Sequence, residues 1–164
     1  MTIKEFQSVF DNLPGMYLLL QPDPPLFTII AANKAFLNGT GTNEKQLIGQ
    51  PVFSVFPDTP GSHNTENQRI LLSFFSEALQ SKQSNQLYNF RYDIPSNTED
   101  GAFLERYWHV FTTPVMNEET VVEQIIISVS DVTEQVLHEK AVKSNLEQTR
   151  SLMADVLTSI SDGF

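Results

Sequence analysis

The residues from 133 to 160 contain neither glycine nor proline, and they constrain the fold more than any other part of the sequence. Apolar side chains recur there at alternating spacings of four and three, the heptad pattern of a coiled coil. This heptad seam has Leu146, Met153 and Ile160 at a and Val142, Thr149 and Val156 at d. We expect one long helix, capped by Asp131 or Thr133, that pairs with a copy of itself. The alternative is a helix that folds back onto its own domain.

The first third of the chain predicts a helix, a hairpin and two short helices. Apolar residues at helical spacing indicate a helix over residues 3–13, which Pro14 and Gly15 end. Apolar runs at 16–21 and 27–32 flank a proline-rich turn, as in an antiparallel hairpin. Short helices are then expected at 34–37 and 44–48, with Asn33 and Asn43 as their N-caps.

The middle of the chain predicts one longer helix followed by three strands. After a brief apolar piece at 51–57 and a loop at 58–64, residues 65–82 have a helical apolar stripe. Residues 87–94 alternate, with Tyr88, Phe90, Tyr92 and Ile94 expected on one face and Asn89, Arg91 and Asp93 on the other. Further strands are expected at 103–115 and 121–132. Helices and strands that do not alternate indicate an α+β fold.

Composition excludes several classes of function. Ten Lys and Arg against twenty Asp and Glu give a net charge of −10, which disfavours binding to nucleic acid or to an anionic membrane. The chain has no cysteine, so a disulfide framework, a covalent flavin and any thiol-linked chromophore are disfavoured. No apolar run approaches the roughly 20 residues that span a bilayer, and residues 1–6 lack the basic-then-apolar layout of a signal peptide. We therefore expect a cytoplasmic protein.

Catalytic and metal-binding patterns are also missing. His63, His109 and His138 are far apart, and no two of them share the i, i+4 spacing of a zinc pair on a helix. We expect no metal site from this pattern. Carboxylates adjacent in sequence fall in turns and are interpreted as solvated.

Six short motifs stand in order along the chain. They are FDNLPGMY at 10–17, ANKAFL at 32–37, LIGQP with VFPD at 47–58, RYDIP at 91–95, ERYW with TPV at 105–115, and SDVTEQ at 130–135. Together they resemble the motifs of PAS domains followed by a signalling helix, as found in bacterial sensor histidine kinases. The last motif contains Asp131, Val132 and Thr133, which match the aspartate–apolar–threonine signature that joins the final strand to the output helix in that family.

The resemblance implies an architecture for the whole chain. It implies a PAS fold, with a five-stranded antiparallel sheet, short helices on one face and a small pocket between them. The expected divisions are an N-terminal helix at 1–14, a sensor domain at 15–132, a signalling helix at 133–160 and the start of a second PAS repeat at 161–164. The chain then looks like a piece of a longer parent protein.

The resemblance also implies an input role. A ligand or partner would alter the sheet, and the change would pass through Asp131, Val132 and Thr133 into a helix that forms a homodimer, with the N-terminal helix as a second candidate contact. The chain itself is expected not to catalyse phosphotransfer, because it has neither a nucleotide-binding loop nor a phosphoacceptor motif, and kinase domains would follow in cis. Haem is not expected, because the usual haem ligand of the family lies on the long helix before the third strand, and residues 66–82 contain no histidine. The rivals are a ligand-independent dimerisation module of a cyclase or transcription regulator, and a small-molecule carrier or enzyme.

The aromatic and aliphatic residues expected between helices and sheet have two interpretations, ordinary core packing or an apolar ligand pocket. Tyr88, Tyr92, Tyr107 and Trp108 could add polar groups to a pocket or face the other side of the sheet. The pocket candidates are Phe36, Phe53, Phe56, Leu71, Phe75, Trp108, Ile125 and Ile127.

Overall fold

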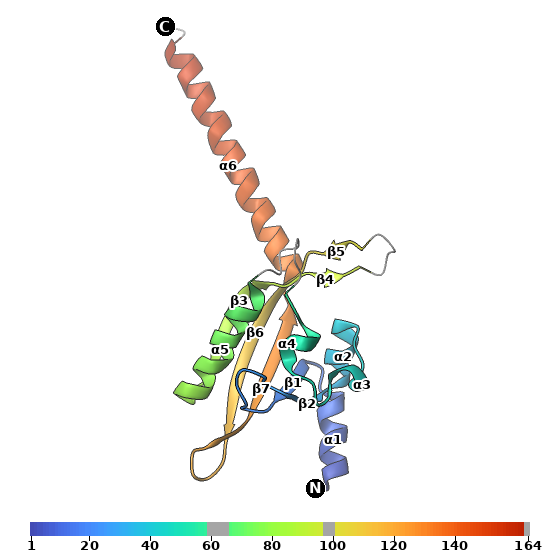
Figure 1. Ribbon diagram of the computed structural model, residues 1–164. Coiled ribbons are helices and arrows are strands. Elements are labelled where there is room, and N and C mark those ends of the chain that lie inside the picture. Colours follow the sequence, from blue (N-terminus) through green and yellow to red (C-terminus); the bar gives the residue numbers. More distant parts are fainter. Residues whose placement is uncertain (59–65, 97–100, 163–164) are drawn as a thin grey trace.

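The computed structural model describes residues 1–58, 66–96 and 101–162. Its centre is an antiparallel sheet of five strands in the order β2-β1-β7-β6-β3 (Figure 1). The strands are β1 (Met16–Leu20), β2 (Ile29–Ala32), β3 (Asn85–Arg91), β6 (Tyr107–Met116) and β7 (Val122–Asp131). A separate two-stranded ribbon pairs β4 (Ile94–Pro95) with β5 (Phe103–Leu104). This arrangement confirms the α+β prediction and the expected hairpin, in which β1 pairs with β2.

The described residues form six helices, which cover the sheet or project from it. Helix α5 and the short helices α2 to α4 lie over one face, whereas α1 and α6 project from opposite ends of the domain (Figure 1). The helices are α1 (Ile3–Asn12), α2 (Lys34–Thr40), α3 (Glu44–Leu47), α4 (Val52–Val55), α5 (Asn67–Ser81) and α6 (Thr133–Asp162). Helix α6 therefore continues two residues past the predicted end at residue 160. Residues 163 and 164 lie outside the described residues, so the expected second repeat stays a prediction.

Asn33 and Asn43 cap α2 and α3 as the sequence predicts. Asn33 does more than cap. It is completely buried, and its Oδ1 accepts hydrogen bonds from the backbone N–H groups of Phe36, at 3.1 Å, and Tyr17, at 3.0 Å. Its Nδ2 donates to the carbonyl oxygen of Gly15 at 2.8 Å. One side chain thus fastens the start of α2 to the chain that enters β1.

The predicted strand at 87–94 is wrong in its alternation and in its end. A bulge falls between Leu87 and Phe90, where Asn89 has a φ of 53°, so the alternation breaks. Tyr88 is consequently 65% exposed, whereas Phe90 is 8% exposed and faces the core. The strand ends at Arg91, and Asp93, expected on the outer face, is buried.

The predicted strand at 103–115 is divided into β5 and β6. The chain leaves the ladder at Arg106, whose backbone carbonyl accepts from Tyr92 N–H at 3.1 Å and whose N–H donates to Asp93 Oδ1 at 3.2 Å. These bonds tie Arg106 to the segment after β3 instead of to the sheet. The single predicted strand is therefore two strands: β5 pairs with β4, and β6 pairs with β3 and β7.

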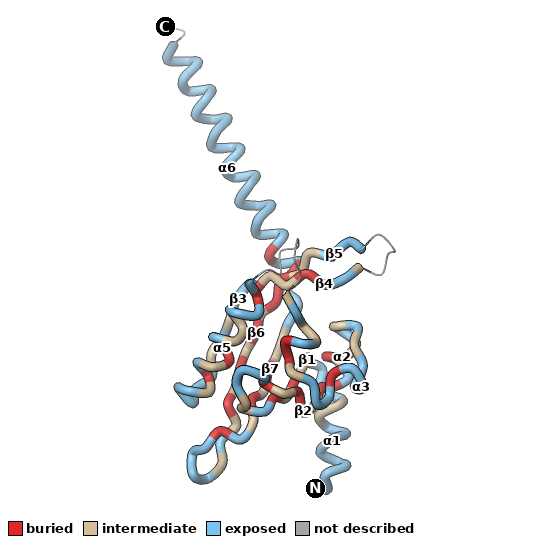
Figure 2. The backbone as a smooth tube through the Cα atoms, viewed as in Figure 1, coloured by how far each residue is buried: buried red, intermediate tan, exposed pale blue. Residues whose placement is uncertain are grey.

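The core lies between the inner face of the sheet and the helices that cover it (Figure 2). Leu18 and Leu20 from β1 meet Ile127 and Ile125 across the ladder, and Phe75 of α5 packs above them. Helix α6 contributes little to this core, because Thr133 and Val136 are its only buried residues among those described. Within the described part of the chain, no helix combines the length and apolarity required to cross a bilayer.

Candidate functional site

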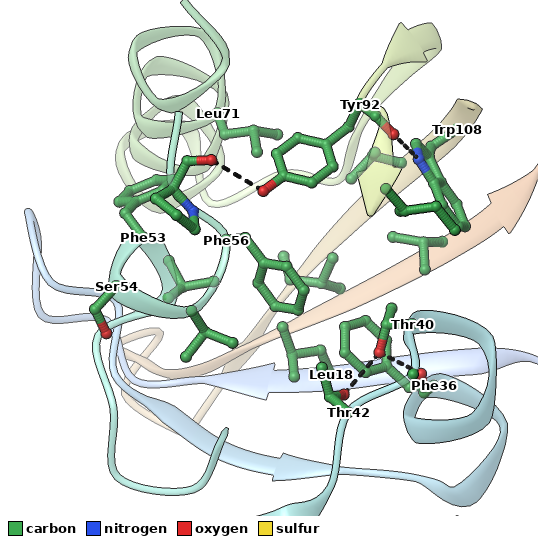
Figure 3. A pocket seen from close by; sticks show the side chains of 18 of the residues that line it. Leu18, Phe36, Thr40, Thr42, Phe53, Ser54, Phe56, Leu71, Tyr92 and Trp108 are labelled. Atoms are coloured by element: carbon green, nitrogen blue, oxygen red, sulfur yellow. Dashed lines mark hydrogen bonds between the residues drawn. The ribbon is translucent and has the colours of Figure 1, made fainter. Parts of the chain in front are cut away.

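A cavity of about 640 Å³ lies between the sheet and the helices on its inner face (Figure 3). This volume falls in the range of about 300–1,000 Å³ that is usual for small-molecule sites. All pocket candidates from the sequence except Ile125 line it. The other lining residues are Leu18, Thr40, Gly41, Thr42, Gln46, Gln50, Val52, Ser54, Val55, Pro57, Phe90, Tyr92, Asp93, Ile94, Pro95, Phe103, Val110 and Val129.

Ile125 is a correction to the predicted lining. It shares the inner face of β7 with Ile127, but it pairs with Leu20 and is 0% exposed. Ile127, one step along that face, pairs with Leu18, and both of those residues line the cavity. The cavity therefore ends between these two levels of the sheet, and beyond that point the core is filled.

Aromatic rings form much of the cavity wall. Phe53 and Phe75 stack with their ring centres 6.2 Å apart, and Phe56 meets Phe36 edge-on at 6.0 Å. Phe56 also meets the ring of Tyr92 edge-on at 6.4 Å. Figure 3 shows Phe56 between Phe36 on one side and Tyr92 on the other. Rings from separate elements thus enclose an apolar space with well-defined faces and edges.

Tyr92 and Trp108 supply polar groups to this wall. The Tyr92 hydroxyl donates to the carbonyl oxygen of Pro57 at 3.0 Å, and Trp108 Nε1 donates to the carbonyl oxygen of Tyr92 at 2.9 Å. Burial, with a smaller effect from Asp58, raises the pKa of Tyr92 to about 12. Tyr92 is therefore an uncharged hydrogen-bond donor at neutral pH.

The other two tyrosines that could have added polar groups lie elsewhere. Tyr88 lies on the outer face and stacks on His109, with ring centres 4.6 Å apart, and Tyr107 lies at the start of β6. No cavity-lining residue among those described is a histidine, and His63 lies outside the described residues. The described chain contains no group of acidic residues and histidines that could hold a metal ion.

Asp93 is the one carboxylate among the described lining residues, and it is bound on several sides. Its oxygens accept from Arg91 Nε at 3.1 Å and Nη2 at 3.2 Å, and from the Arg106 amide. This hydrogen bonding raises the pKa of Arg91. The buried charge at the cavity is thus matched by the protein itself.

The junction residues Asp131, Val132 and Thr133 join the end of β7 to the start of α6, and Val132 and Thr133 are bonded to Tyr107, the first residue of β6. Thr133 Oγ1 accepts from the Tyr107 amide at 2.9 Å and donates to Asp131 Oδ1 at 2.5 Å. The Val132 amide donates to the Tyr107 carbonyl at 2.9 Å. Asp131 Oδ1 also accepts from the Thr133 amide, the first of α6, at 3.0 Å, and its Oδ2 lies 3.7 Å from Arg106 Nε.

A second contact, which no sequence pattern predicts, holds α6 to Tyr107. Lys140 Nζ donates to the Tyr107 hydroxyl, which itself donates to Glu105 Oε1 at 2.7 Å. The guanidinium of Arg91 lies 5.7 Å from the centre of the Tyr107 ring. A chain of contacts therefore runs from Asp93 at the cavity through Arg91 and Tyr107 to Lys140 on the helix.

The heptad seam is exposed along its whole length (Figure 2). Leu152 and Leu157 are also exposed and flank the seam at g and e positions, which sequence reasoning did not include. On α1, Ile3, Phe6 and Val9 are exposed as well. Both projecting helices thus carry apolar side chains that the domain does not cover.

Comparison with known proteins gave a family match and structural neighbours. The family model described as "PAS domain" matches residues 14–134. No curated protein matches the sequence. The PAS domain of Bordetella pertussis BvgS superposes with a TM-score of 0.57 at 15% identity, over 89% of this chain and 97% of that one.

Two further structures have the same fold. A sensory box sensor histidine kinase from Vibrio cholerae matches with a TM-score of 0.51 at 18% identity, over 79% of this chain and 90% of that one. An RNA-binding light-oxygen-voltage receptor matches with a TM-score of 0.57 at 21% identity, over 91% of this chain. This chain spans only 36% of that receptor's length.

Proposed function

Because the chain belongs to the PAS domain family, we propose that it is the input module of a cytoplasmic two-component sensor histidine kinase. A small molecule in the cavity alters the sheet, and the change passes through Asp131, Val132 and Thr133 to α6. The chain has no catalytic role, and the kinase domains belong to a longer parent protein. Similarity to a sensory box histidine kinase structure supports this output.

The observation that carries the proposal is the adjacency of Trp108 and Tyr107 on β6. Trp108 lines the cavity, and Tyr107 binds both Thr133 and Lys140 of α6. Neighbouring residues on a strand move together, so a ligand that displaces Trp108 also displaces the two anchors of the helix. The hydrogen bond from Trp108 to the Tyr92 carbonyl makes the turn after β3 part of the same movement.

The output is a change in the pairing of two α6 helices. The exposed heptad seam is long enough for a parallel dimer, and a paired seam has discrete packing arrangements. A small displacement at Thr133 therefore selects between arrangements. The exposed apolar side chains of α1 form a second contact between the two copies.

The experiment uses the complete chain with one spin label on each copy. The chain has no cysteine, so Ser151→Cys, which lies opposite the seam at an f position, gives a single labelling site. Pulsed electron paramagnetic resonance then measures the distance between the two labels. Leu71→Phe fills the cavity from α5, and Leu79→Phe, a partly buried residue of the same helix outside the lining, is its control.

We expect one interhelical distance in the parent variant, a different distribution with Leu71→Phe, and no change with Leu79→Phe. An absence of any dimeric distance would overturn the pairing of α6. An unchanged distance with Leu71→Phe would overturn transmission from the cavity to the helix. The kinase output is tested separately, by autophosphorylation of the parent protein carrying the same two substitutions.

A further inference from the structure

The cavity offers no positive charge to a ligand. Among the described residues that line it there is no lysine, arginine or histidine, and the whole chain carries a net charge of −10. An anionic ligand would lose its hydration on entry and find no counter-charge inside. A phosphate or carboxylate group is therefore strongly disfavoured there.

The cavity also offers little to a cation. Its single carboxylate among the described residues, Asp93, already accepts hydrogen bonds from Arg91 and from the Arg106 amide. A second cation beside it would compete with the Arg91 guanidinium. The cation–π stabilisation from aromatic faces is smaller than the free energy needed to desolvate an isolated cation. The ligand that fits this lining is uncharged.

The rings of the wall favour an aromatic guest. Phe53 and Phe75 stack at an interplanar angle of 17°, whereas the ring of Phe56 meets Phe36 at 86°. A planar molecule in this space can stack against some rings and meet others edge-on. Both arrangements exploit the negative face and positive edge of aromatic systems.

One hydroxyl in the wall is left as an acceptor. Thr40 Oγ1 donates its single hydrogen to the Phe36 carbonyl at 2.8 Å. The hydrogen in the 2.7 Å contact between the Thr40 and Thr42 hydroxyls therefore comes from Thr42. Thr42 keeps its lone pairs but has no proton to offer. Figure 3 shows this pair of threonines beside Phe36.

The strong donors on the opposite wall are already used within the protein. The Tyr92 hydroxyl donates to Pro57, and the indole N–H of Trp108 donates to Tyr92. Ser54 likewise donates to the Pro51 carbonyl at 2.8 Å. Gln46 and Gln50 also line the cavity, but both are exposed to solvent. The interior side chains thus present acceptors and ring surfaces, which a hydrogen-bond donor complements.

We propose that the cavity binds an uncharged aromatic molecule that donates a hydrogen bond to the Thr42 hydroxyl oxygen. This inference rests on the proposed function, since it specifies the ligand of the same cavity. The class includes phenols and indoles and excludes nucleotides and carboxylic acids. Thr42 acts here as a specificity-determining residue.

The test is a calorimetric titration of the full chain at pH 7 with three naphthalene probes. These are 2-naphthol, which is uncharged and has a donor, 2-methoxynaphthalene, which lacks the donor, and 2-naphthoate, which is anionic. We expect 2-naphthol to bind at least about tenfold more tightly than either of the others. Quenching of Trp108, the chain's only tryptophan, places the probe in the cavity.

Thr42→Val removes the acceptor and keeps the side-chain shape. It should reduce the preference for 2-naphthol over 2-methoxynaphthalene to about twofold or less. Thr113→Val, on the strand β6 but outside the lining, should retain the full preference. Thermal unfolding of each variant checks that it is folded. The comparison of the three probes on the unmodified chain does not depend on either variant.

The outcomes separate this inference from the proposed function. Equal or tighter binding of 2-naphthoate would overturn the uncharged class while leaving the cavity a ligand site. An unchanged preference in a folded Thr42→Val variant would overturn the hydrogen bond. Failure of all three probes to bind would overturn both the inference and the ligand-driven part of the proposed function.

Discussion

Lys140 Nζ lies 2.6 Å from the hydroxyl oxygen of Tyr107 and 4.5 Å from the centre of its ring. Thr133, seven residues earlier on α6, accepts from the backbone N–H of the same tyrosine. The helix is thus held to Tyr107 at two points about 10 Å apart along its axis. Contacts at both Thr133 and Lys140 fix the direction of the helix axis, whereas a contact at Thr133 alone would fix only the position of its first residue.

Replacing Lys140 by methionine should release the second anchor and leave the first. The hydrogen bond and the cation–π contact are lost, so backbone amides between residues 134 and 142 should exchange with solvent several-fold faster. Hydrogen exchange read by mass spectrometry measures this. Lys143→Met is the control, because Lys143 is exposed on the same helix. Equal exchange in the two variants would show that Lys140 does not hold the helix.

Thr133→Val should destabilise the whole domain. It leaves the buried N–H of Tyr107 without its acceptor, which costs about 1–3 kcal/mol in the free energy of unfolding. Urea denaturation measures the loss as a lower midpoint at an unchanged slope. Thr133→Ser keeps the hydroxyl and should cost clearly less. If serine and valine prove equally costly, packing of the methyl group, not the hydrogen bond, is what Thr133 contributes.

Tyr92 should make stability fall at alkaline pH. Its pKa is about 12 in the folded protein against 10 for the free side chain, mainly because of burial. Between these values the unfolded chain has released the proton and the folded chain still holds it, so raising the pH favours unfolding. The contribution of Tyr92 to the free energy of unfolding is complete below pH 10 and is lost as the pH rises through about 12.

The measurement for Tyr92 is the free energy of unfolding from pH 9 to pH 12, compared with Tyr92→Phe. The other titrating groups are common to both proteins, so the difference between the two slopes isolates this phenol. We expect the steeper fall in the unmodified chain. Parallel curves would mean that the phenol titrates alike in both states.

Leu146→Glu should dissociate the dimer that we propose. Each copy loses a buried leucine at an a position, worth about 1.5–3 kcal/mol, so two copies weaken association roughly a hundredfold or more. Sedimentation equilibrium of the full chain measures this. Ser151→Glu adds the same charge at an f position and should leave association unchanged. A dimer that survives Leu146→Glu would have to be held by another surface, of which α1 is the first candidate.

Features encoded by neighbouring residues could be predicted from the sequence. The caps at Asn33 and Asn43, the hairpin and α6 all have local signals, in which a polar residue precedes an apolar period or a turn separates two apolar runs. The pocket candidates other than Ile125 could also be chosen from the sequence, because inward-facing positions recur regularly along strands and helices. The end of the cavity could not be predicted, since it depends on how side chains fill the core.

Features that depend on distant partners were missed. The bulge at Asn89 switches the side of the sheet that the residues before it face, and no neighbouring residue in the sequence predicts this switch. Asp93 looked like a surface residue because its Arg106 partner lies thirteen positions away. Lys140 looked like an ordinary solvated lysine on a long helix. Its contact with Tyr107 spans thirty-three positions and exists only when the fold is complete.

The 30 residues of α6 make a rod about 45 Å long, attached to the domain at its base alone. A tilt of about 5° at Thr133 would carry the far end sideways by about 4 Å, roughly three-quarters of one helical pitch. The geometry works as a lever with a short arm in the protein and a long arm outside it. A displacement of about 1 Å across the two anchors on Tyr107 is therefore enough to move the tip by several ångströms.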